Sequence, residues 1–163
     1  MVTGASSGIG REVCIDLAEA GFRIVAAARR TDRLRSLCDE INGFGSESGS
    51  NKARAVPVEL DAEECARHSL WYFSQNFCCG GVHAALDWPE EEWNSNIRTN
   101  LTGLWLVSKH VCRRMRDAKV EGSVINISSV TGLERAQGPG AIAYSASKTG
   151  VTAVTRVTVQ TSP

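Results

Sequence analysis

The stretch Thr3-Gly4-Ala5-Ser6-Ser7-Gly8-Ile9-Gly10 lies almost at the start of the chain and decides which fold to expect. Gly4 and Gly8 permit positive φ angles and a close approach of backbone to a ligand, and Gly10 permits tight packing of the following helix on a strand. The N-terminus of that helix presents free N–H groups and the positive end of its dipole to the turn. The pattern therefore favours an anion, usually a dinucleotide pyrophosphate, although surface turns also collect glycine and serine.

The composition is that of one ordinary globular domain. The chain has 163 residues, and its 18 Lys and Arg residues balance 18 Asp and Glu residues. A net charge of zero argues against nucleic acid and anionic membranes as partners. No apolar run approaches the ~20 residues of a membrane span, and no secretory signal is visible. We expect a single domain over residues 1–163 in the cytoplasm, or in a plastid if an N-terminal segment has been lost.

Metal-ligating patterns are missing from the sequence. The six cysteines are irregularly spaced, and the three histidines show no ligand spacing with one another or with the cysteines. Free buried thiols are the expectation for the cysteines, and no metal site is expected.

Strands and helices alternate outward from the glycine turn. A helix with Ile9, Val13, Leu17 and Ala20 on one face precedes a buried strand over 22–28. A helix capped by Thr31 follows, and one of its faces carries Leu34, Leu37, Cys38 and Ile41. A loop over 43–53 then leads to a strand over 55–61. Pro57 removes a donor from the sheet ladder and indicates an edge strand. The third strand lies at the edge of a sheet of order 3-2-1-4-5-6. We therefore predict an α/β fold with a doubly wound, Rossmann-like parallel sheet.

The second half of the chain continues this rhythm. A long helix from Pro89 has an apolar stripe of Trp93, Ile97, Leu101, Leu104, Val111 and Met115. A further strand is predicted over 122–127, and it ends in Ser128-Ser129 at the carboxyl edge, where ligands bind in open α/β sheets. The last helix opens near Tyr144.

Tyr144 and Lys148 are spaced four residues apart, hence on one helix face. An ammonium close to a phenol favours phenolate and lowers the tyrosine pKa from its ordinary value of about 10, which gives an acid and base near neutral pH. A hydroxyl from Ser128 or Ser129 would donate to the same substrate oxygen. These groups predict protonation of a carbonyl during hydride transfer from a nicotinamide; an ordinary surface Tyr/Lys pair is the alternative.

Taken in order, Thr-Gly-xxx-Gly-Ile-Gly, Asn100-Leu101-Thr102-Gly103, Ser128-Ser129 and Tyr144-xxx-Lys148 resemble the short-chain dehydrogenase/reductase family. The branch of 3-oxoacyl-(acyl-carrier-protein) reductases of fatty acid biosynthesis, plant members included, looks most similar. The resemblance covers nearly the whole chain apart from residues 68–86.

The resemblance implies a role for each motif. Tyr144 would be the catalytic acid and base, and Lys148 would lower its pKa and bind the nicotinamide ribose. Ser129 would orient the carbonyl, and it is preferred to Ser128 because Ser129-Val130-Thr131-Gly132 matches the family's Ser-x-x-Gly ending. Asn100 would hold a water in a proton relay, although it also fits an ordinary polar position of a long helix.

The cofactor implied by the resemblance is NADP (NADPH). The residues expected to bind it are Gly4, Ser6, Ser7, Gly8, Ile9, Gly10, Arg29, Arg30, Asp61, Tyr144 and Lys148. Arginine after the second strand suits a 2′-phosphate, and Arg29 is expected to make the main contact, whereas NAD-preferring members carry an acidic residue there. Ser7 replaces the family's second basic residue. Asp61 would contact the adenine, or would simply cap a helix.

Three departures from the family pattern predict an incomplete sheet. Only Met1-Val2 precede Thr3, so the first strand is a stub. The Asn-Asn-Ala-Gly motif expected between Asp61 and Trp93 is absent, so the fourth strand is disrupted, and an altered exon junction or a reading-frame error would explain it. The chain also stops at Pro163, before the family's later strands, cofactor loop and lid.

Two functional hypotheses follow. The first is an NADP-dependent short-chain oxidoreductase that reduces a small carbonyl substrate, such as a 3-oxoacyl thioester, to an alcohol. The alternative is a truncated, catalytically inactive relative that at most binds nucleotide or pairs with a full-length homologue. Family members oligomerise through the helices that contain Asn100 and follow Tyr144, so a homo-oligomer or such a pairing is expected.

Overall fold

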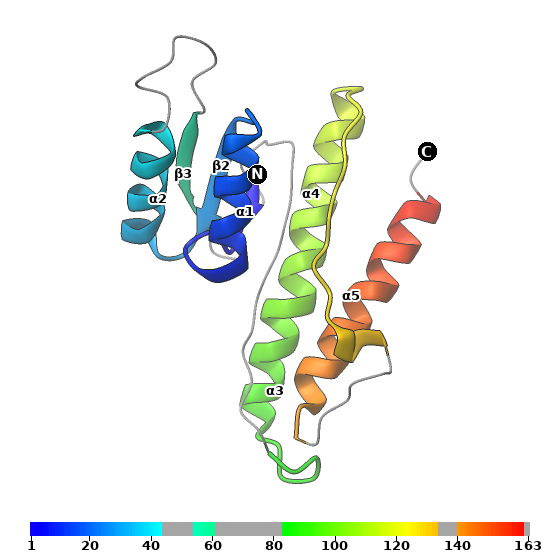
Figure 1. Cartoon of the computed structure of the whole chain (residues 1–163). Coiled ribbons are helices and arrows are strands. Elements are labelled where there is room, and N and C mark those ends of the chain that lie inside the picture. The colour runs from blue at the N-terminus through cyan, green and yellow to red at the C-terminus, as the bar shows by residue number, and fades with distance from the viewer. Residues whose placement is uncertain (44–53, 61–82, 134–139, 162–163) are drawn as a thin grey trace.

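The computed structural model describes residues 1–43, 54–60, 83–133 and 140–161 (Figure 1). The predicted loop over 43–53, Asp61 and the expected fourth strand fall largely or wholly outside these residues. Two helices alternate with three strands in the first part of the described chain, and the second part consists mainly of long helices.

The sheet is parallel and begins with a very short strand. β1 (Val2–Thr3) pairs with β2 (Ile24–Ala28), which pairs with β3 (Ala55–Glu59), in the order β1-β2-β3. In register, Val2 lies opposite Ala26, and Ala26 lies opposite Pro57. The 3-2-1 part of the predicted strand order, the edge position of Pro57 among the described strands and the stub of a first strand are confirmed. Because all three strands are parallel, their carboxyl ends meet at one edge.

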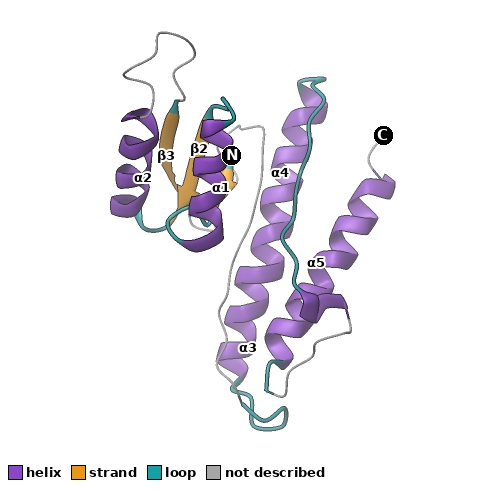
Figure 2. Ribbon diagram, in the orientation of Figure 1, coloured by secondary structure: helices purple, strands orange, loops and turns teal. Residues whose placement is uncertain are grey.

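Helices cover both faces of this sheet (Figure 2). Ile24, Ala26 and Ala28 of β2 join one core cluster with residues of α1 (Gly8–Glu19) and α2 (Thr31–Gly43). Val25 and Ala27 join a second cluster with residues of α4 (Gly103–Asp117) and α5 (Ile142–Thr161). Alternate side chains of a strand point to opposite faces, so a strand covered on both sides must be apolar throughout. This is the layered α/β arrangement of a Rossmann-like fold.

The buried face of α1 differs from the predicted one. Ile9 is 55% exposed, and the buried residues of the helix are Gly10, Cys14 and Ala18. A Cβ on Gly10 would lie 2.5 Å from the carbonyl oxygen of Gly4, so the line of closest approach must be made of small residues. The fully buried line of α1 is therefore shifted by one position from the predicted stripe, although Val13 and Leu17 of that stripe are half-buried and pack against the core. On α2 the predicted face of Leu34, Leu37, Cys38 and Ile41 is buried as expected.

Three helical segments follow one another without a break over residues 90–117. They are α3 (Glu90–Ile97), the π-helical segment η1 (Arg98–Thr102) and α4, and α5 lies beside them (Figure 1). The predicted apolar stripe is buried or half-buried throughout. α5 begins at Ile142, two residues before Tyr144. Within the described residues, none of the helices combines the length and apolar character of a membrane span.

The strand predicted over 122–127 does not form. Its one bridge residue is Val124, and none of β1 to β3 pairs with it. A strand needs a neighbouring strand to pair its backbone N–H and C=O groups. The neighbour expected here would come from residues outside the described part. The segment is held by side chains instead: Ser108 Oγ donates to Asn126 Oδ1 (3.3 Å), and Asn126 Nδ2 donates to Thr155 Oγ1 (2.9 Å). A pocket of about 680 Å³ lies between α4, this segment and α5.

Candidate active site

The glycine turn after β1 has the expected backbone. Gly4 and Gly8 have φ angles of 67° and 56°, which lie in the left-handed region that favours glycine. The amide of Ala5 donates to the carbonyl of Ala27 (3.3 Å) and ties the turn to β2. α1 starts at Gly8, so its first N–H groups face the turn. The positive φ angles predicted for Gly4 and Gly8 are confirmed.

One arginine lies directly on this turn. Arg30 follows β2, and its Nη2 donates to Ser7 Oγ (2.6 Å) and Ser6 Oγ (3.1 Å), with Nε 3.3 Å from Ser6 Oγ. These partners are neutral hydroxyls rather than carboxylates. Both arginines are exposed, but Arg29, the expected main contact, makes none of these bonds. The geometry therefore favours Arg30 over Arg29 as the arginine of the turn.

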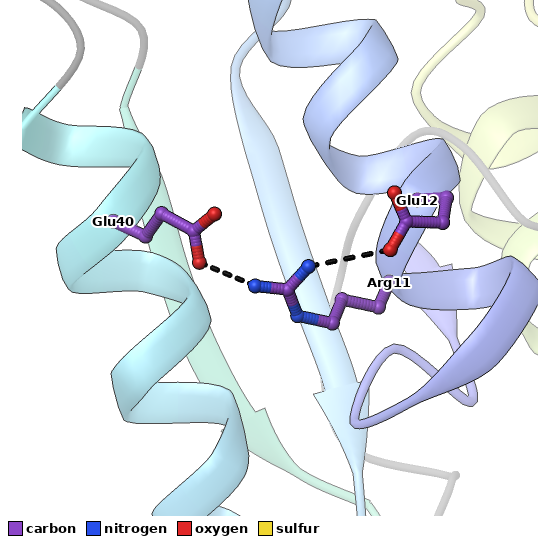
Figure 3. Close-up of polar contacts among 3 residues, drawn as sticks. All are labelled: Arg11, Glu12 and Glu40. Atoms are coloured by element: carbon purple, nitrogen blue, oxygen red, sulfur yellow. Dashed lines mark hydrogen bonds and ion pairs between the residues drawn. The ribbon is translucent and has the colours of Figure 1, made fainter.

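A second arginine near the turn forms ion pairs with carboxylates. Arg11 of α1 lies 2.5 Å from Glu40 of α2 and 3.3 Å from the neighbouring Glu12 (Figure 3). The Arg11 guanidinium is thus paired with carboxylates between the two helices. Its contribution to stability is small, because partly exposed ion pairs contribute about 0–1 kcal/mol. The arginine whose hydrogen bonds reach the serines of the turn is Arg30.

Tyr144 and Lys148 lie close together on α5. The Lys148 side chain is only 2% exposed, its Nζ donates to the carbonyl of Ile127 (3.1 Å), and Nζ lies 5.7 Å from the centroid of the Tyr144 ring. A buried lysine held by a backbone carbonyl is not an ordinary surface lysine. The interpretation as a surface Tyr/Lys pair is therefore wrong, and the predicted shared helix face is confirmed.

The two serines after residue 127 differ in their surroundings. Ser128 Oγ donates to the carbonyl of Lys148 (3.0 Å) and lies 3.1 Å from Thr152 Oγ1, so its hydroxyl fastens the segment to α5. Ser129 Oγ accepts from the amide (3.3 Å) and the hydroxyl (3.0 Å) of Thr131. Both of these bonds use the lone pairs of Ser129, so its proton can be donated to a substrate. This geometry supports the preference for Ser129.

Asn100 lies in the middle of η1 and is 1% exposed. Its Nδ2 donates to Ser147 Oγ (3.1 Å), and Ser147 Oγ donates to the carbonyl of Tyr144 (2.7 Å). Asn100 Oδ1 is buried and has no donor among the described residues. π-Helical insertions are frequent at functional sites. Sequence analysis missed Ser147, and the signal that points to it is a small polar residue directly before Lys148.

Three cysteines lie in the described part, and all are free thiols. Burial raises the pKa of the Cys14 thiol to about 12 and that of Cys38 to about 11. Burial also raises the pKa of Cys112. Because the thiolate is the reactive form, these thiols are unsuited to nucleophilic chemistry near neutral pH. No cluster of three or more His, Cys, Asp or Glu side chains suited to a metal occurs over the described ranges.

The arrangement fits a dinucleotide cofactor. Gly4 and Gly8 of the turn have positive φ angles, and at Gly10 the helix comes so close to the Gly4 backbone that a Cβ would not fit. The N-terminus of α1 and the guanidinium of Arg30 also lie at the turn. These features suit phosphate groups at the carboxyl edge of the sheet. The buried Lys148 ammonium and the Tyr144 phenol offer groups for proton transfer. Asp61, the expected adenine contact, lies outside the described residues.

Comparison with known proteins gives a consistent result. The sequence profile described as "short chain dehydrogenase" matches residues 1–161. The chain is 32% identical to farnesol dehydrogenase of Aedes aegypti, over 95% of this chain and 66% of the relative. It is also 32% identical to human (3R)-3-hydroxyacyl-CoA dehydrogenase (96% and 64%) and to a 3-oxoacyl-(acyl-carrier-protein) reductase of Staphylococcus epidermidis (96% and 65%).

A solved structure shows the same likeness. The crystal structure of a putative short-chain alcohol dehydrogenase from Sinorhizobium meliloti superposes with a TM-score of 0.82 at 32% identity, over 96% of this chain and 63% of that one. The chain thus spans just under two thirds of the length of these relatives. The matched profile, the relatives and the shared fold lead to one conclusion: the chain belongs to the short-chain dehydrogenase family.

Proposed function

We propose that the chain is an NADP(H)-dependent oxidoreductase that reduces a ketone to an alcohol at a site made by Ser129, Tyr144 and Lys148. The observation that carries this proposal is the buried Lys148, fixed 5.7 Å from the Tyr144 ring centroid on the same face of α5. A lysine in that position stabilises the anionic form of a neighbouring phenol. The pair is therefore suited to proton transfer rather than to solvation of a surface.

Each side chain of the site has its own role in the proposed reaction. The nicotinamide supplies the hydride when it is bound. Ser129 donates its hydroxyl proton as a hydrogen bond to the substrate carbonyl oxygen, and Tyr144 gives a proton to the same oxygen as negative charge develops there. Lys148 stabilises the phenolate that remains, and Asn100 offers a buried polar atom near the same turn of α5.

The preference for NADP(H) rests on Arg30. Its guanidinium donates to the neutral hydroxyls of Ser6 and Ser7. Arginine binds a 2′-phosphate through charge-assisted hydrogen bonds. No carboxylate occupies positions 29 and 30, where an acidic residue would favour the free ribose hydroxyls of NAD.

A 3-oxoacyl thioester is the substrate class that we propose. Two of the relatives carry names that refer to 3-hydroxyacyl or 3-oxoacyl compounds, although the third is named for farnesol. Since the chain spans less than two thirds of the human and bacterial relatives, the substrate and activity of the whole protein belong to this proposal.

The test is oxidation of NADPH in the presence of an acetoacetyl thioester, measured for the wild-type chain and for Tyr144→Phe. Turnover by the wild type that falls at least about a hundredfold in Tyr144→Phe supports the proposal. Folded protein that binds NADPH but gives no turnover would support the alternative, an inactive relative that retains only nucleotide binding. Absence of NADPH binding by folded protein contradicts the proposal and also nucleotide binding by an inactive relative, and leaves only pairing with a full-length homologue.

A further inference from the structure

Ser147 connects two residues of the candidate site that come from different elements. It lies in α5 between Tyr144 and Lys148, and its side chain is fully buried. Its Oγ is 2.7 Å from the carbonyl oxygen of Tyr144 and 3.1 Å from Nδ2 of Asn100. Asn100 belongs to η1, so this one hydroxyl joins the π-helical segment to the turn of α5 that bears the proton-transfer pair.

The direction of these two hydrogen bonds follows from a count of protons. A serine hydroxyl has one proton, and a backbone carbonyl can only accept. The short contact with Tyr144 therefore uses the proton of Ser147, and Ser147 Oγ can only accept from Asn100. The Asn100 amide must then present Nδ2, not Oδ1, to Ser147.

The orientation of the Asn100 amide is thereby fixed. An asparagine side chain without such a constraint can rotate its amide and exchange its donor for its acceptor. With Nδ2 held by Ser147, the buried Oδ1 is turned away from Ser147 as an acceptor. At that position Oδ1 can accept a hydrogen bond from a water or from another N–H or O–H donor, and it cannot bond to a second acceptor.

We propose that Ser147 is a positioning residue that fixes the orientation of the Asn100 amide, so that Asn100 acts as a hydrogen-bond acceptor in proton transfer to and from Tyr144. The catalytic consequence rests on the proposed function. The hydrogen bond itself is independent of that function, which allows the two to be tested separately.

The chain provides a matched control in the same helix turn. Ser145 is also buried, but its Oγ has no hydrogen-bond partner within the described part of the chain. Ser145→Ala and Ser147→Ala each delete one buried hydroxyl from α5. A difference between the two variants therefore reports the bonds of Ser147 and not the general effect of removing a polar atom.

The first experiment is steady-state reduction of an acetoacetyl thioester by NADPH in the full chain. We expect Ser147→Ala to lower kcat about tenfold, with the KM for NADPH unchanged within about twofold, and to increase the solvent deuterium isotope effect on kcat. Ser145→Ala should have the same kcat, KM for NADPH and solvent deuterium isotope effect as the wild type. An unchanged kcat in Ser147→Ala, or an equal loss in both variants, would overturn the inference.

The second experiment needs no activity. The ¹⁵N side-chain amide signal of Asn100 is assigned as the one lost in Asn100→Asp, and its proton exchange is measured in each variant. Exchange should be at least about tenfold faster in Ser147→Ala than in the wild type or Ser145→Ala. Equal exchange in all three proteins would refute the hydrogen bond. If the wild type shows no turnover, the proposed function fails while this measurement still decides the role of Ser147.

Discussion

At the residue scale, Arg30 shows how one side chain sets the charge of the candidate cofactor site. It bonds to two neutral serines, whereas Arg11 is paired with Glu40 and Glu12. Arg30→Ala should therefore weaken NADPH binding by about 10- to 100-fold, because a charge-assisted hydrogen bond contributes about 1.5–3 kcal/mol. NADH binding should change little. Titration of both nucleotides into the wild type, Arg30→Ala and the control Arg29→Ala measures this; an equal loss for Arg29→Ala would show that the two arginines share the contact.

The buried thiol of Cys14 gives a pH prediction at the same scale. Burial raises its pKa from 9.0 to about 12, so the folded state retains a proton that the unfolded state loses above pH 9. The stabilising effect is complete below pH 9 and is lost as the pH rises through about 12. Urea unfolding from pH 8 to 11 should show a steeper decline in the free energy of unfolding for the wild type than for Cys14→Ala. Parallel declines would contradict this account.

At the scale of elements, the close approach of α1 to the turn depends on one missing side chain. A Cβ at Gly10 would lie 2.5 Å from the backbone oxygen of Gly4, and backbone cannot easily move aside. Gly10→Ala should lower the free energy of unfolding by about 1–3 kcal/mol and reduce NADPH affinity. Gly43→Ala, at the end of α2, meets no atom within 4 Å and should change stability by less than about 1 kcal/mol. Similar stabilities for the two variants in urea unfolding would argue against tight packing at Gly10.

Sequence patterns predicted the elements that depend on local chemistry. The glycine turn, the apolar run of β2, the edge position of Pro57 and the long helix from Glu90 follow from glycine conformation, hydrophobic burial and helical periodicity. The strand over 122–127 was predicted wrongly because its neighbour, not its own sequence, decides whether a ladder forms. The α1 stripe was shifted by one residue because close packing selects small residues over large apolar ones.

At the scale of the whole molecule, the candidate site depends on segments far apart in the chain. Motif order indicated that Asn100, Ser129, Tyr144 and Lys148 act together, and the structure brings Asn100 to α5 through Ser147. The role of Ser147 and the choice of Arg30 over Arg29 were not predicted, since both are decided by side-chain geometry. Asp61 and the segment around it stay a prediction.

The central claim is that a hydride and a proton reach one carbonyl at the Tyr144–Lys148 pair. The most direct measurement supplies NADPH that carries deuterium at the transferable position, together with an acetoacetyl thioester, and weighs the product by mass spectrometry. We predict a 3-hydroxyacyl product with one deuterium from the wild type, and loss of that product in Tyr144→Phe with NADPH affinity retained. Unlabelled or absent product from folded, nucleotide-bound wild type, or equal product from Tyr144→Phe, would contradict the claim.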